Sequence, residues 1–557
     1  MLFDIIFYCY YLMIVMLLSF VIQYVIMATL QFESYNIVRL LKSRFSFFIK
    51  NILLYIIFVF LTIFSIVFYK LNYQNFNIIF LIIIDFLMSV FYIKQMSFFR
   101  LVFTKRIIRL MITIFILELI FFVLSINWFS NNFFVIFNSL ILILNLIIVI
   151  LSSGVNYPIE KIISNRFIKS AKRKLTNNKN LIKIGITGSY GKTTVKEILY
   201  KILSMQYSTV ATPKSYNTTM GVSKTINENL KPTTEVFVCE MGAKKSGEIL
   251  ELASLVSVDM GIVTSVGSQH IETFKSLDVV YNTKKELPDY LHNKLCVFNL
   301  MNSYTKKMYY EFVGKRIGVF VVYKKINNPK LIIKKSYNSF RIIHNNFYSK
   351  LYLYPLRNNY YAKVLNLTEN GSEFVIYCNR ERMGVINTNL LGVHNILNIV
   401  MAISMAMELS VSFSKIKSAI ESIYSISARL ERYTTSKGAV VINNGYNSNI
   451  DSARSTLSVL NLFKDKTKVV ITPGVIETGD DFTVNRKFGK VVGGVADEVI
   501  IVKDKNRDAI LLGLNDCCFD MSKVYSVKSF NDVRGVIDIA GDNYVFMIEN
   551  DLPDYYK

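Results

Sequence analysis

The chain has 557 residues, a formal net charge of +24 and 52% hydrophobic residues, a share that is high for a soluble protein. The charge would suit a nucleic-acid partner, but the basic residues are dispersed and the aromatic residues lie in apolar runs, whereas a base-stacking surface interleaves the two. We therefore expect no nucleic-acid partner. The six cysteines show no metal-binding spacing, which excludes a cysteine-ligated zinc site.

Five apolar runs occupy the first 152 residues, and each approaches or exceeds the roughly 17–25 residues that a bilayer-crossing helix needs. The runs are Leu2–Leu30, Asn51–Tyr69, Asn77–Ile93, Leu110–Ile126 and Phe134–Ser152. Buried core helices are the alternative, but a succession of such runs with short links favours membrane spans. The pattern predicts a multi-pass α-helical transmembrane domain over residues 1–152. Asp4 replaces the basic start of a signal peptide, so we expect no cleavage of the first run.

Basic residues gather in alternate links between these runs. The links after runs one and three carry several Lys and Arg residues, the link after run two carries only Lys70, and the link after run four has no charge. Because cytoplasmic loops carry the excess of Lys and Arg, the N-terminus is expected outside and everything after Ser152 inside. The sequence thus predicts a protein of the cell (inner) membrane with cytoplasmic catalytic domains and the lipid bilayer as a partner. Asp85 and Glu118 fall within runs three and four, where a carboxylate is either functional, or is paired with a polar neighbour or placed near a helix end.

After a basic linker over residues 153–180, short apolar strands alternate with helical stretches. The strands are predicted at Leu181–Ile186, Val236–Cys239, Met260–Val263, Val440–Asn443 and Lys468–Thr472. This alternation predicts an α/β fold with a parallel sheet, in which ligands bind at the carboxyl ends of the strands. The stretch Tyr309–Leu390 differs, because its Tyr, Ile and Val residues predict further β-strands.

A glycine-rich loop lies between the first of these strands and a predicted helix at Thr193–Met205. Its glycines let backbone N–H groups approach phosphate oxygens, Lys192 can reach the terminal phosphates, and Thr193 can ligate Mg²⁺. Ile186 stands where the strict Walker pattern has Gly, so the loop is a variant of that pattern. The sequence predicts ATP binding by Gly188, Ser189, Tyr190, Gly191, Lys192, Thr193 and Thr194.

Further motifs follow this loop in order along the chain. They are Thr212–Ser223, Cys239–Ile249, Thr264–Phe274, Thr283–Leu287, Gly392–Asn398, Ala428–Arg432 and Asn443–Asn449. Together with the loop they resemble the Mur ligase family, most closely its members that add D-alanyl-D-alanine in peptidoglycan synthesis. The resemblance covers the chain from Leu181 onward. It implies a central P-loop ATPase domain over residues 181–427 and a Rossmann-like C-terminal ligase domain over residues 428–557.

The resemblance also implies a reaction. In the family, ATP phosphorylates an acceptor carboxylate, and an incoming amine attacks the acyl phosphate to form an amide. Carried over to this chain, the Mg²⁺ ligands are expected to be Thr193, Glu240, His270 and Lys284, and the catalytic residues Lys192, His270 and Lys284. A neutral imidazole is an unusual ligand for Mg²⁺, so His270 is assigned by the resemblance alone. Lys284 matches a position that many members carbamylate, although Lys285 beside it leaves the register open by one residue.

The nucleotide contacts are likewise implied by the resemblance. Asn395 and Asn398 match the family's adenine contacts, Arg429 matches an Arg that reaches ATP from the C-terminal domain, and Asn444 stands at a position expected to contact the nucleotide. An Asn pair spaced by three residues could instead cap a helix.

Several departures from the family pattern bear on function. Asn443 and Asn444 replace paired aspartates, which removes charge beside the nucleotide, and Met301 replaces another acid. The segment between Ser152 and Leu181 is too short for the N-terminal domain that grips UDP in soluble members.

The predicted activity is an ATP-dependent, amide-forming acid–amino acid ligase of cell-envelope synthesis. It would work on a lipid-linked or UDP-linked precursor and take an amino acid or D-Ala-D-Ala as co-substrate. A poly-γ-glutamate-type synthetase and a degenerate, nucleotide-binding scaffold remain as alternatives.

Overall fold

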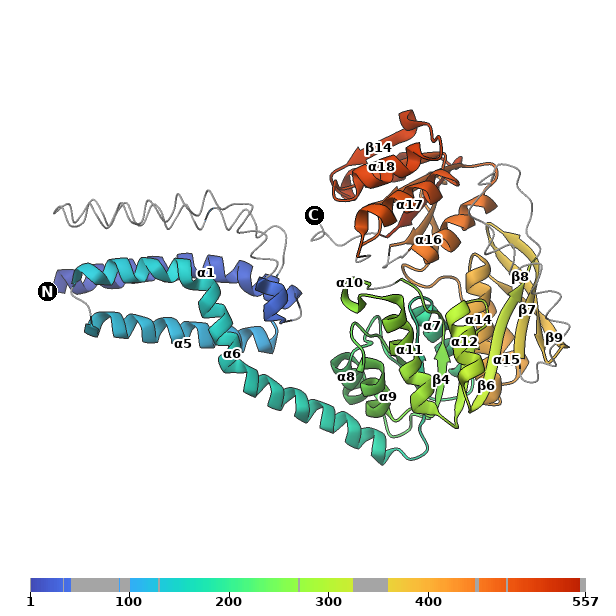
Figure 1. Cartoon of the computed structure of the whole chain (residues 1–557), viewed down its shortest axis with the longest axis horizontal. Helices are drawn as coiled ribbons and strands as arrows, with labels where there is room; N and C mark the ends of the chain where they lie inside the picture. The colour runs from blue at the N-terminus through green and yellow to red at the C-terminus, as the bar shows by residue number, and fades with distance from the viewer. Residues whose placement is uncertain are drawn as a thin grey trace. The chain divides into compact units, whose positions relative to one another are not determined.

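The computed structural model describes residues 2–33, 35–41, 90, 101–128, 131–268, 271–323, 359–445, 450–476 and 479–550. The chain divides into two compact units, Met1–Arg166 and Phe167–Lys557 (Figure 1). Apart from Val90, the second and third apolar runs lie outside the described residues, as does Asp85. The membrane spans predicted for these two runs, and the role of Asp85, stay predictions.

The described helices of the first unit cover the other three apolar runs. They are α1 (Leu2–Phe32), α5 (Lys105–Trp128) and α6 (Asn131–Asn177). Buried apolar side chains of all three helices form one core, with Ile26 on α1, Ile114 on α5 and Val149 on α6 among them. Over the part of the chain that the structure describes, one stretch of helix, Asn145–Asn177, is long and apolar enough to span a membrane.

A buried polar cluster lies inside this apolar unit. The Ser19 hydroxyl donates a hydrogen bond to Glu118 Oε1 at 2.7 Å, and Gln23 Nε2 donates to the same oxygen at 2.5 Å. Gln23 Nε2 also donates to Asn145 Oδ1 at 2.7 Å, so the cluster joins α1, α5 and α6. Of the two alternatives for Glu118, pairing with polar neighbours is the one observed.

The segment expected to be a basic linker is largely helical, because α6 continues through it to Asn177 with Pro158 inside the helix. The end of α6 belongs to the second unit. Ala171 and Leu175 are buried in its core, and Asn227 Nδ2 donates a hydrogen bond to the carbonyl of Phe167 at 2.9 Å. The last turns of α6 are therefore packed against the domain that carries the glycine-rich loop.

Within the described residues, the first sheet of the second unit has nine strands in the order β2-β3-β1-β4-β5-β6-β7-β8-β9. Neighbouring strands are parallel as far as β7, and β8 and β9 add an antiparallel extension. The strands are β1 (Ile182–Thr187), β2 (Thr209–Ala211), β3 (Val236–Glu240), β4 (Met260–Val263), β5 (Leu295–Asn299), β6 (Lys315–Val322), β7 (Asn359–Thr368), β8 (Gly371–Cys378) and β9 (Glu381–Thr388).

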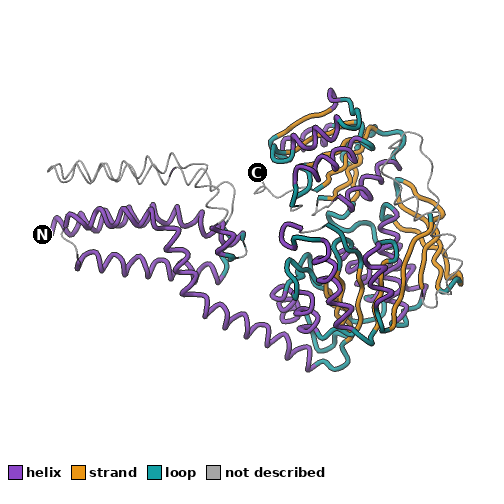
Figure 2. Tube along the Cα trace, viewed as in Figure 1, coloured by secondary structure: helices purple, strands orange, loops and turns teal. Residues whose placement is uncertain are grey.

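Helices cover both faces of this sheet (Figure 2). One core contains side chains of α7, α14 and α15 together with Ile184 and Ile186 of β1, and the other contains side chains of α8, α9, α11 and α12 with Phe237 of β3. The helices are α7 (Lys192–Leu203), α8 (Thr219–Asn229), α9 (Glu248–Val256), α10 (Ile271–Phe274), α11 (Leu277–Leu291), α12 (Ser303–Glu311), α14 (Val393–Glu408) and α15 (Phe413–Glu421).

The second sheet has the strand order β10-β11-β15-β12-β13-β14 in the described part of the chain. Only β10 is antiparallel to its neighbour there, and β11 lies beside β15 with Asn444 opposite Glu549. The strands are β10 (Glu431–Thr434), β11 (Val440–Asn444), β12 (Thr467–Thr472), β13 (Glu498–Val502), β14 (Val524–Val527) and β15 (Tyr544–Glu549). The helices are α16 (Ile450–Leu457), α17 (Asp481–Gly493), α18 (Arg507–Asn515) and α19 (Asn531–Ile539).

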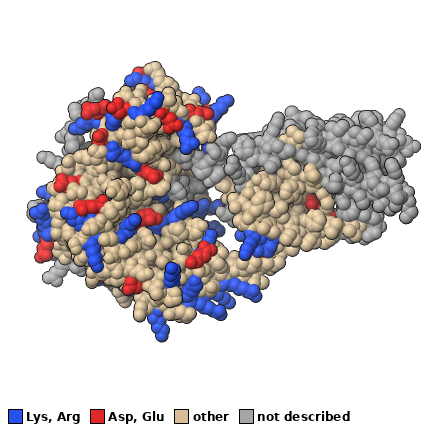
Figure 3. All heavy atoms as spheres, turned by 180° about the vertical axis from the view of Figure 1, so that it is seen from behind, with Lys and Arg blue, Asp and Glu red and all other residues tan. Residues whose placement is uncertain are grey.

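The α/β prediction is confirmed in detail. Each of the five predicted strands coincides with an observed strand to within a residue at either end, and α7 begins one residue before the predicted helix. The stretch beginning at Tyr309 is helical at its start, because Tyr309 belongs to α12, and then forms β6 before the described chain resumes at β7. On the face of the second unit seen in Figure 3, Lys and Arg side chains lie among Asp and Glu side chains and form no single basic stripe.

Candidate active site

The glycine-rich loop joins β1 to α7 and is tied to the loop that follows β4. The backbone N–H of Ser189 donates to the Ser265 carbonyl at 2.8 Å, and the N–H of Tyr190 donates to the Ser265 hydroxyl at 2.9 Å. A Cβ atom at Gly188 would lie 2.1 Å from the Thr264 hydroxyl, and Gly191 has a φ of +84°. Both positions therefore require glycine, which explains the spacing of this variant loop.

Lys192 is the first residue of α7, and its side chain lies back over the glycine-rich loop. Its Nζ donates hydrogen bonds to the carbonyls of Gly188 at 2.7 Å and Ser189 at 3.2 Å. The pKa of Lys192 is lowered to about 8, mainly by burial and also by the positive charge of Arg429, while the Glu240 carboxylate opposes the shift. The ammonium therefore lies in an enclosed place where an anionic phosphate would stabilise its charged form.

Glu240 ends β3, next to the end of β1, and its side chain is only 2% exposed. Oε1 accepts a hydrogen bond from Asn217 Nδ2 at 3.2 Å, while Oε2 has no hydrogen-bond partner and lies 3.6 Å from Lys196 Nζ. Buried carboxylate oxygens are usually hydrogen-bonded or bound to a cation, so this oxygen fits a Mg²⁺ ligand.

Two further residues, His270 and Lys284, were predicted as metal ligands. His270 lies outside the described residues, so its role stays a prediction. Among the residues that the structure describes, no three His, Cys, Asp or Glu side chains are grouped as a metal site.

Lys284 lies on α11 and is only 3% exposed. The pKa of Lys284 is lowered to about 7, mainly by burial and also by the charge of Lys192, while Glu286 and Glu248 act in the opposite direction. Lys285 instead pairs with Glu311 at 2.9 Å near the surface. The structure therefore separates the two lysines, and Lys284 is the one that faces Lys192.

Asn395 and Asn398 lie in the first turns of α14 and are buried. Asn395 Nδ2 donates to the Leu391 carbonyl at 2.9 Å, and Asn398 Nδ2 donates to Asn395 Oδ1 at 3.3 Å. A Cβ atom at Gly191 would lie 2.9 Å from Asn398 Oδ1, so Asn398 packs against the glycine-rich loop. The helix carries no side-chain cap at its N-cap residue Gly392, and the adenine contacts stay a prediction.

Arg429 sits in a strained turn before β10. Ala428 and Leu430 on either side have φ values of +52° and +53°, in the left-handed region that non-glycine residues seldom adopt. The turn is held by the Ala428 N–H, which donates to Glu431 Oε2 at 3.0 Å. Strain of this kind persists where the surroundings demand a fixed side-chain direction, and here Arg429 acts electrostatically on Lys192.

Asn444 ends β11, where its Nδ2 donates to Glu549 Oε2 at 2.9 Å. The Thr456 hydroxyl donates to the same oxygen at 3.1 Å, and Glu549 is fully buried. Glu549 was not predicted from the sequence. The signal that could have found it is an acid at the end of the apolar strand 544–549.

Lys196 is a second residue that the sequence did not reveal. It is fully buried, its Nζ donates to the Lys214 carbonyl at 2.8 Å, and it lies near the carboxylates of Glu197 and Glu240. The available signal was its spacing from Lys192, since residues four apart lie on the same face of a helix.

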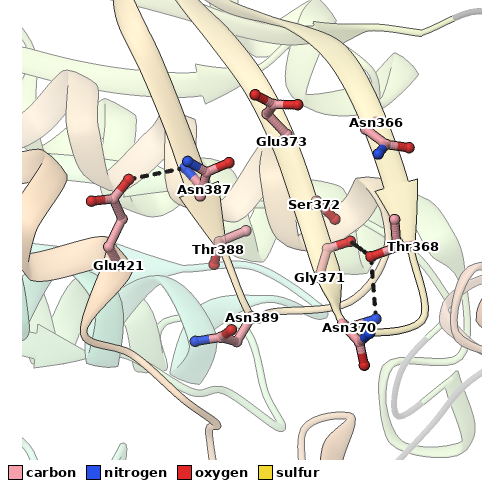
Figure 4. Close-up of a pocket in the computed structure, with 10 residues that line it drawn as sticks. All are labelled: Asn366, Thr368, Asn370, Gly371, Ser372, Glu373, Asn387, Thr388, Asn389 and Glu421. Carbon is pink, nitrogen blue, oxygen red and sulfur yellow. Dashed lines mark hydrogen bonds between the residues drawn. The ribbon is translucent and has the colours of Figure 1, made fainter.

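A separate hollow of about 460 Å³ lies on the antiparallel extension of the first sheet (Figure 4). It is lined by polar residues of β7, β8 and β9, with the Asn387 N–H donating to Glu421 Oε1 at 3.3 Å. Since β7 is four strands from β1, this hollow is distinct from the glycine-rich loop.

Residues 186–406 match the Mur ligase middle domain. Curated relatives carry the name UDP-N-acetylmuramoyl-tripeptide–D-alanyl-D-alanine ligase. The protein from Buchnera aphidicola is 27% identical over 64% of this chain and 68% of its own length. The protein from Bacillus subtilis is 24% identical over 56% of this chain and 60% of its own length.

Solved structures show the same fold. MurF from Acinetobacter baumannii superimposes with a TM-score of 0.57 at 19% identity, covering 71% of this chain and 78% of that one. MurF from Thermotoga maritima, crystallised in complex with ADP, superimposes with a TM-score of 0.52 at 18% identity, covering 70% and 80%. The second unit therefore has a Mur ligase fold, in which the glycine-rich loop, Lys192, Glu240 and Lys284 meet at the carboxyl end of the first sheet.

Proposed function

We propose, from the premise that residues 186–406 form a Mur ligase middle domain, that the chain is an ATP-dependent acid–amino acid ligase of cell-envelope synthesis. The observation that carries the proposal is the position of Lys192 beside the loop, where its charge interacts with that of Glu240 and with that of Lys284. This is the arrangement that transfer of a phosphoryl group needs, because catalysis of that step is mostly positioning and charge stabilisation.

In the proposed reaction, the γ-phosphoryl group of ATP moves to an acceptor carboxylate, and ADP leaves. The amine of the second substrate then attacks the acyl phosphate, and phosphate leaves as the amide forms. The backbone N–H groups of the loop and the ammonium of Lys192 would hold the phosphates. Thr193 and Glu240 would hold Mg²⁺, with His270 as a further ligand, and the bound ion would neutralise charge on the phosphoryl group.

Lys284 is suited to form a carbamate. Its lowered pKa keeps much of the amine neutral near pH 7, and only the neutral amine attacks CO₂. The nitrogen forms a bond to carbon and releases a proton, which leaves an anionic carbamate. Two oxygens would thereby be added to a site whose described residues supply few carboxylates.

The substrates are proposed by analogy with the curated relatives, whose name specifies a UDP-N-acetylmuramoyl-tripeptide and D-alanyl-D-alanine. This chain would take a UDP-linked or lipid-linked precursor as acceptor and an amino acid or D-Ala-D-Ala as amine. A lipid-linked acceptor is favoured, because apolar helices stand where soluble members of the family are expected to bind UDP.

The first unit is proposed as a multi-pass membrane domain, with the second unit on the cytoplasmic side. Large apolar side chains along α5 are exposed, which a lipid environment would tolerate better than water. They include Ile112, Phe115, Ile116, Leu119, Ile120 and Val123. Held in the membrane, the ligase would meet a lipid-linked substrate at a raised local concentration.

The test is ADP release by detergent-purified full-length protein with Mg²⁺-ATP and bicarbonate. The acceptor is either a membrane-lipid extract or a UDP-linked precursor, and the amine is taken from a panel of amino acids and D-Ala-D-Ala. We expect ADP release that needs both an amine and an acceptor, and none with Lys192→Ala. ATP binding without turnover for every pair would instead support the nucleotide-binding scaffold, the alternative that Asn443 and Asn444 favour. Repeated incorporation of glutamate would support the poly-γ-glutamate-type synthetase.

A further inference from the structure

The replacement of an expected aspartate by Asn444 coincides with a carboxylate on the neighbouring strand. Asn444 lies opposite Glu549 in the parallel pair β11–β15, at the carboxyl ends of both strands. Asn444 Nδ2 donates to Glu549 Oε2 at 2.9 Å, and both side chains are buried. The pair therefore retains one carboxylate at this edge of the sheet, on a different strand from the one that the family pattern leads us to expect.

The bond to Glu549 also fixes which way the Asn444 amide points. An Asn side chain can present either its NH₂ group or its oxygen, whereas an aspartate presents only oxygens. A carboxylate partner accepts hydrogen bonds only, so it draws Nδ2 and turns Oδ1 away from itself. No other described residue donates a hydrogen bond to this oxygen. In this orientation Asn444 offers an acceptor to its surroundings, as an aspartate would.

The end of β11 is joined to two segments that reach the glycine-rich loop. Asn443 is opposite Glu431, two residues after Arg429, whose charge acts on Lys192. After β11 in the chain, Asp451 at the start of α16 lies close to Gly267. A Cβ atom added to Gly267 would lie 3.4 Å from Asp451 Oδ2. Asn444 thus lies in the short stretch of chain between two groups that approach the phosphate-binding region.

We propose that Glu549 is a positioning residue that holds Asn444 Oδ1 as a hydrogen-bond acceptor for a substrate group. The partner would be a donor, either a hydroxyl or amino group of the nucleotide or the amine of the second substrate. This inference rests on the proposed ligase function. It also explains why the loss of aspartates need not mean a degenerate site.

The experiment measures three quantities on full-length protein in detergent: the Kd for ATP, the KM for the amine and the thermal midpoint. Glu549→Gln lets the two facing amides turn, so the acceptor is no longer fixed. In the double variant Asn444→Asp with Glu549→Gln, the amide at 549 donates to the carboxylate at 444. Position 444 then presents only oxygens, so the acceptor is fixed as in the native protein. Thr456→Val is the matched control, since it removes the other hydrogen bond to the same oxygen and leaves Asn444 untouched.

We expect Glu549→Gln to raise either the Kd for ATP or the KM for the amine by about three- to tenfold, the worth of one hydrogen bond. The quantity that rises identifies the donor. The double variant should return to within about threefold of the native value, and Thr456→Val should lower only the thermal midpoint. If Glu549→Gln does not fold, Asn444→Ala takes its place and should raise either the Kd for ATP or the KM for the amine.

Unchanged substrate constants in Glu549→Gln or in Asn444→Ala, with only the thermal midpoint lowered, would show a purely structural pair and overturn the proposal. A double variant no better than Glu549→Gln would overturn it too. Failure of the ligase proposal is distinguishable, because native protein would then show no amine-dependent ADP release to begin with.

Discussion

The ammonium of Lys196 on α7 lies 3.6 Å from the Oε2 atom of Glu240 on β3, and both side chains are buried. Lys196 also donates to the Lys214 carbonyl, so one side chain connects the helix after the glycine-rich loop with β3 and the segment before α8. The pair places a cation beside the carboxylate that we assign to Mg²⁺.

Lys196→Met should destabilise the second unit strongly, because removal of one partner leaves a buried carboxylate without its counter-charge. Losses from breaking buried ion pairs are about 3–5 kcal/mol. The measurement is the thermal or urea unfolding of the full-length protein in detergent. Lys201→Met, an exposed position on the same helix, is the control and should leave the midpoint unchanged. Equal midpoints for the two variants would contradict a stabilising role for the Lys196–Glu240 pair.

Lys192→Ala should slow phosphoryl transfer by orders of magnitude while leaving the fold intact. Within the described part of the chain, its ammonium donates hydrogen bonds to carbonyls of the loop itself, so the fold loses little. Removal of one such charge-stabilising donor costs about 10²–10³-fold in kcat. ADP release at saturating ATP measures the effect, with Lys201→Ala as the matched helix control. A Lys192→Ala protein of near-native turnover would exclude the loop as the phosphate site.

Particular residues show which parts of the fold and of the site could be predicted from the sequence. The glycine-rich loop, Glu240 and the five strands could be predicted, because each depends on neighbours close in the chain. The contact of Asn444 with Glu549 could not, since it requires knowing that β11 and β15, far apart in sequence, are adjacent in the sheet. The choice between Lys284 and Lys285 likewise depends on which side of α11 faces the loop.

Lys284 should carry a carbamate whose amount grows with bicarbonate and with pH. The reactive species is the neutral amine, and its fraction increases as the pH rises through about 7. The labelled carbamate carbon can be observed by ¹³C NMR after incubation with ¹³C-bicarbonate. Lys284→Met should abolish the signal and lower turnover, and Lys285→Met should alter neither. A signal that survives Lys284→Met would move the carbamate to another lysine.

Lys284 also makes stability depend on pH in a definite direction. Its pKa is lowered from 10.5 to about 7 in the folded protein, so the unfolded chain binds its proton first as the pH falls. The native lysine therefore destabilises the fold increasingly between pH 10.5 and about 7, and by a constant amount below that. Compared with native protein, Lys284→Met should gain relative stability on going from pH 10 to pH 7. A difference that does not change with pH would contradict the lowered pKa. Bicarbonate must be absent in this measurement, because a carbamate removes the titrating amine.

Glu118 offers a test of the polar cluster in the first unit. Its Oε1 accepts hydrogen bonds from Ser19 and Gln23, so Glu118→Leu would leave buried polar groups of α1 without that acceptor. We expect a loss of about 1–3 kcal/mol in the stability of the detergent-solubilised protein. Glu118→Gln keeps an acceptor oxygen, so its stability should lie between that of Glu118→Leu and that of the native protein.

The control for this cluster is Leu119→Ala, because Leu119 is 43% exposed on the same helix and should matter little to the core. Thermal aggregation of the full-length protein in detergent measures all three variants. If Glu118→Leu is as stable as native protein while ligase turnover falls, the cluster is not a packing element. Glu118 would then have a functional role in the first unit, the other alternative for a carboxylate within an apolar run.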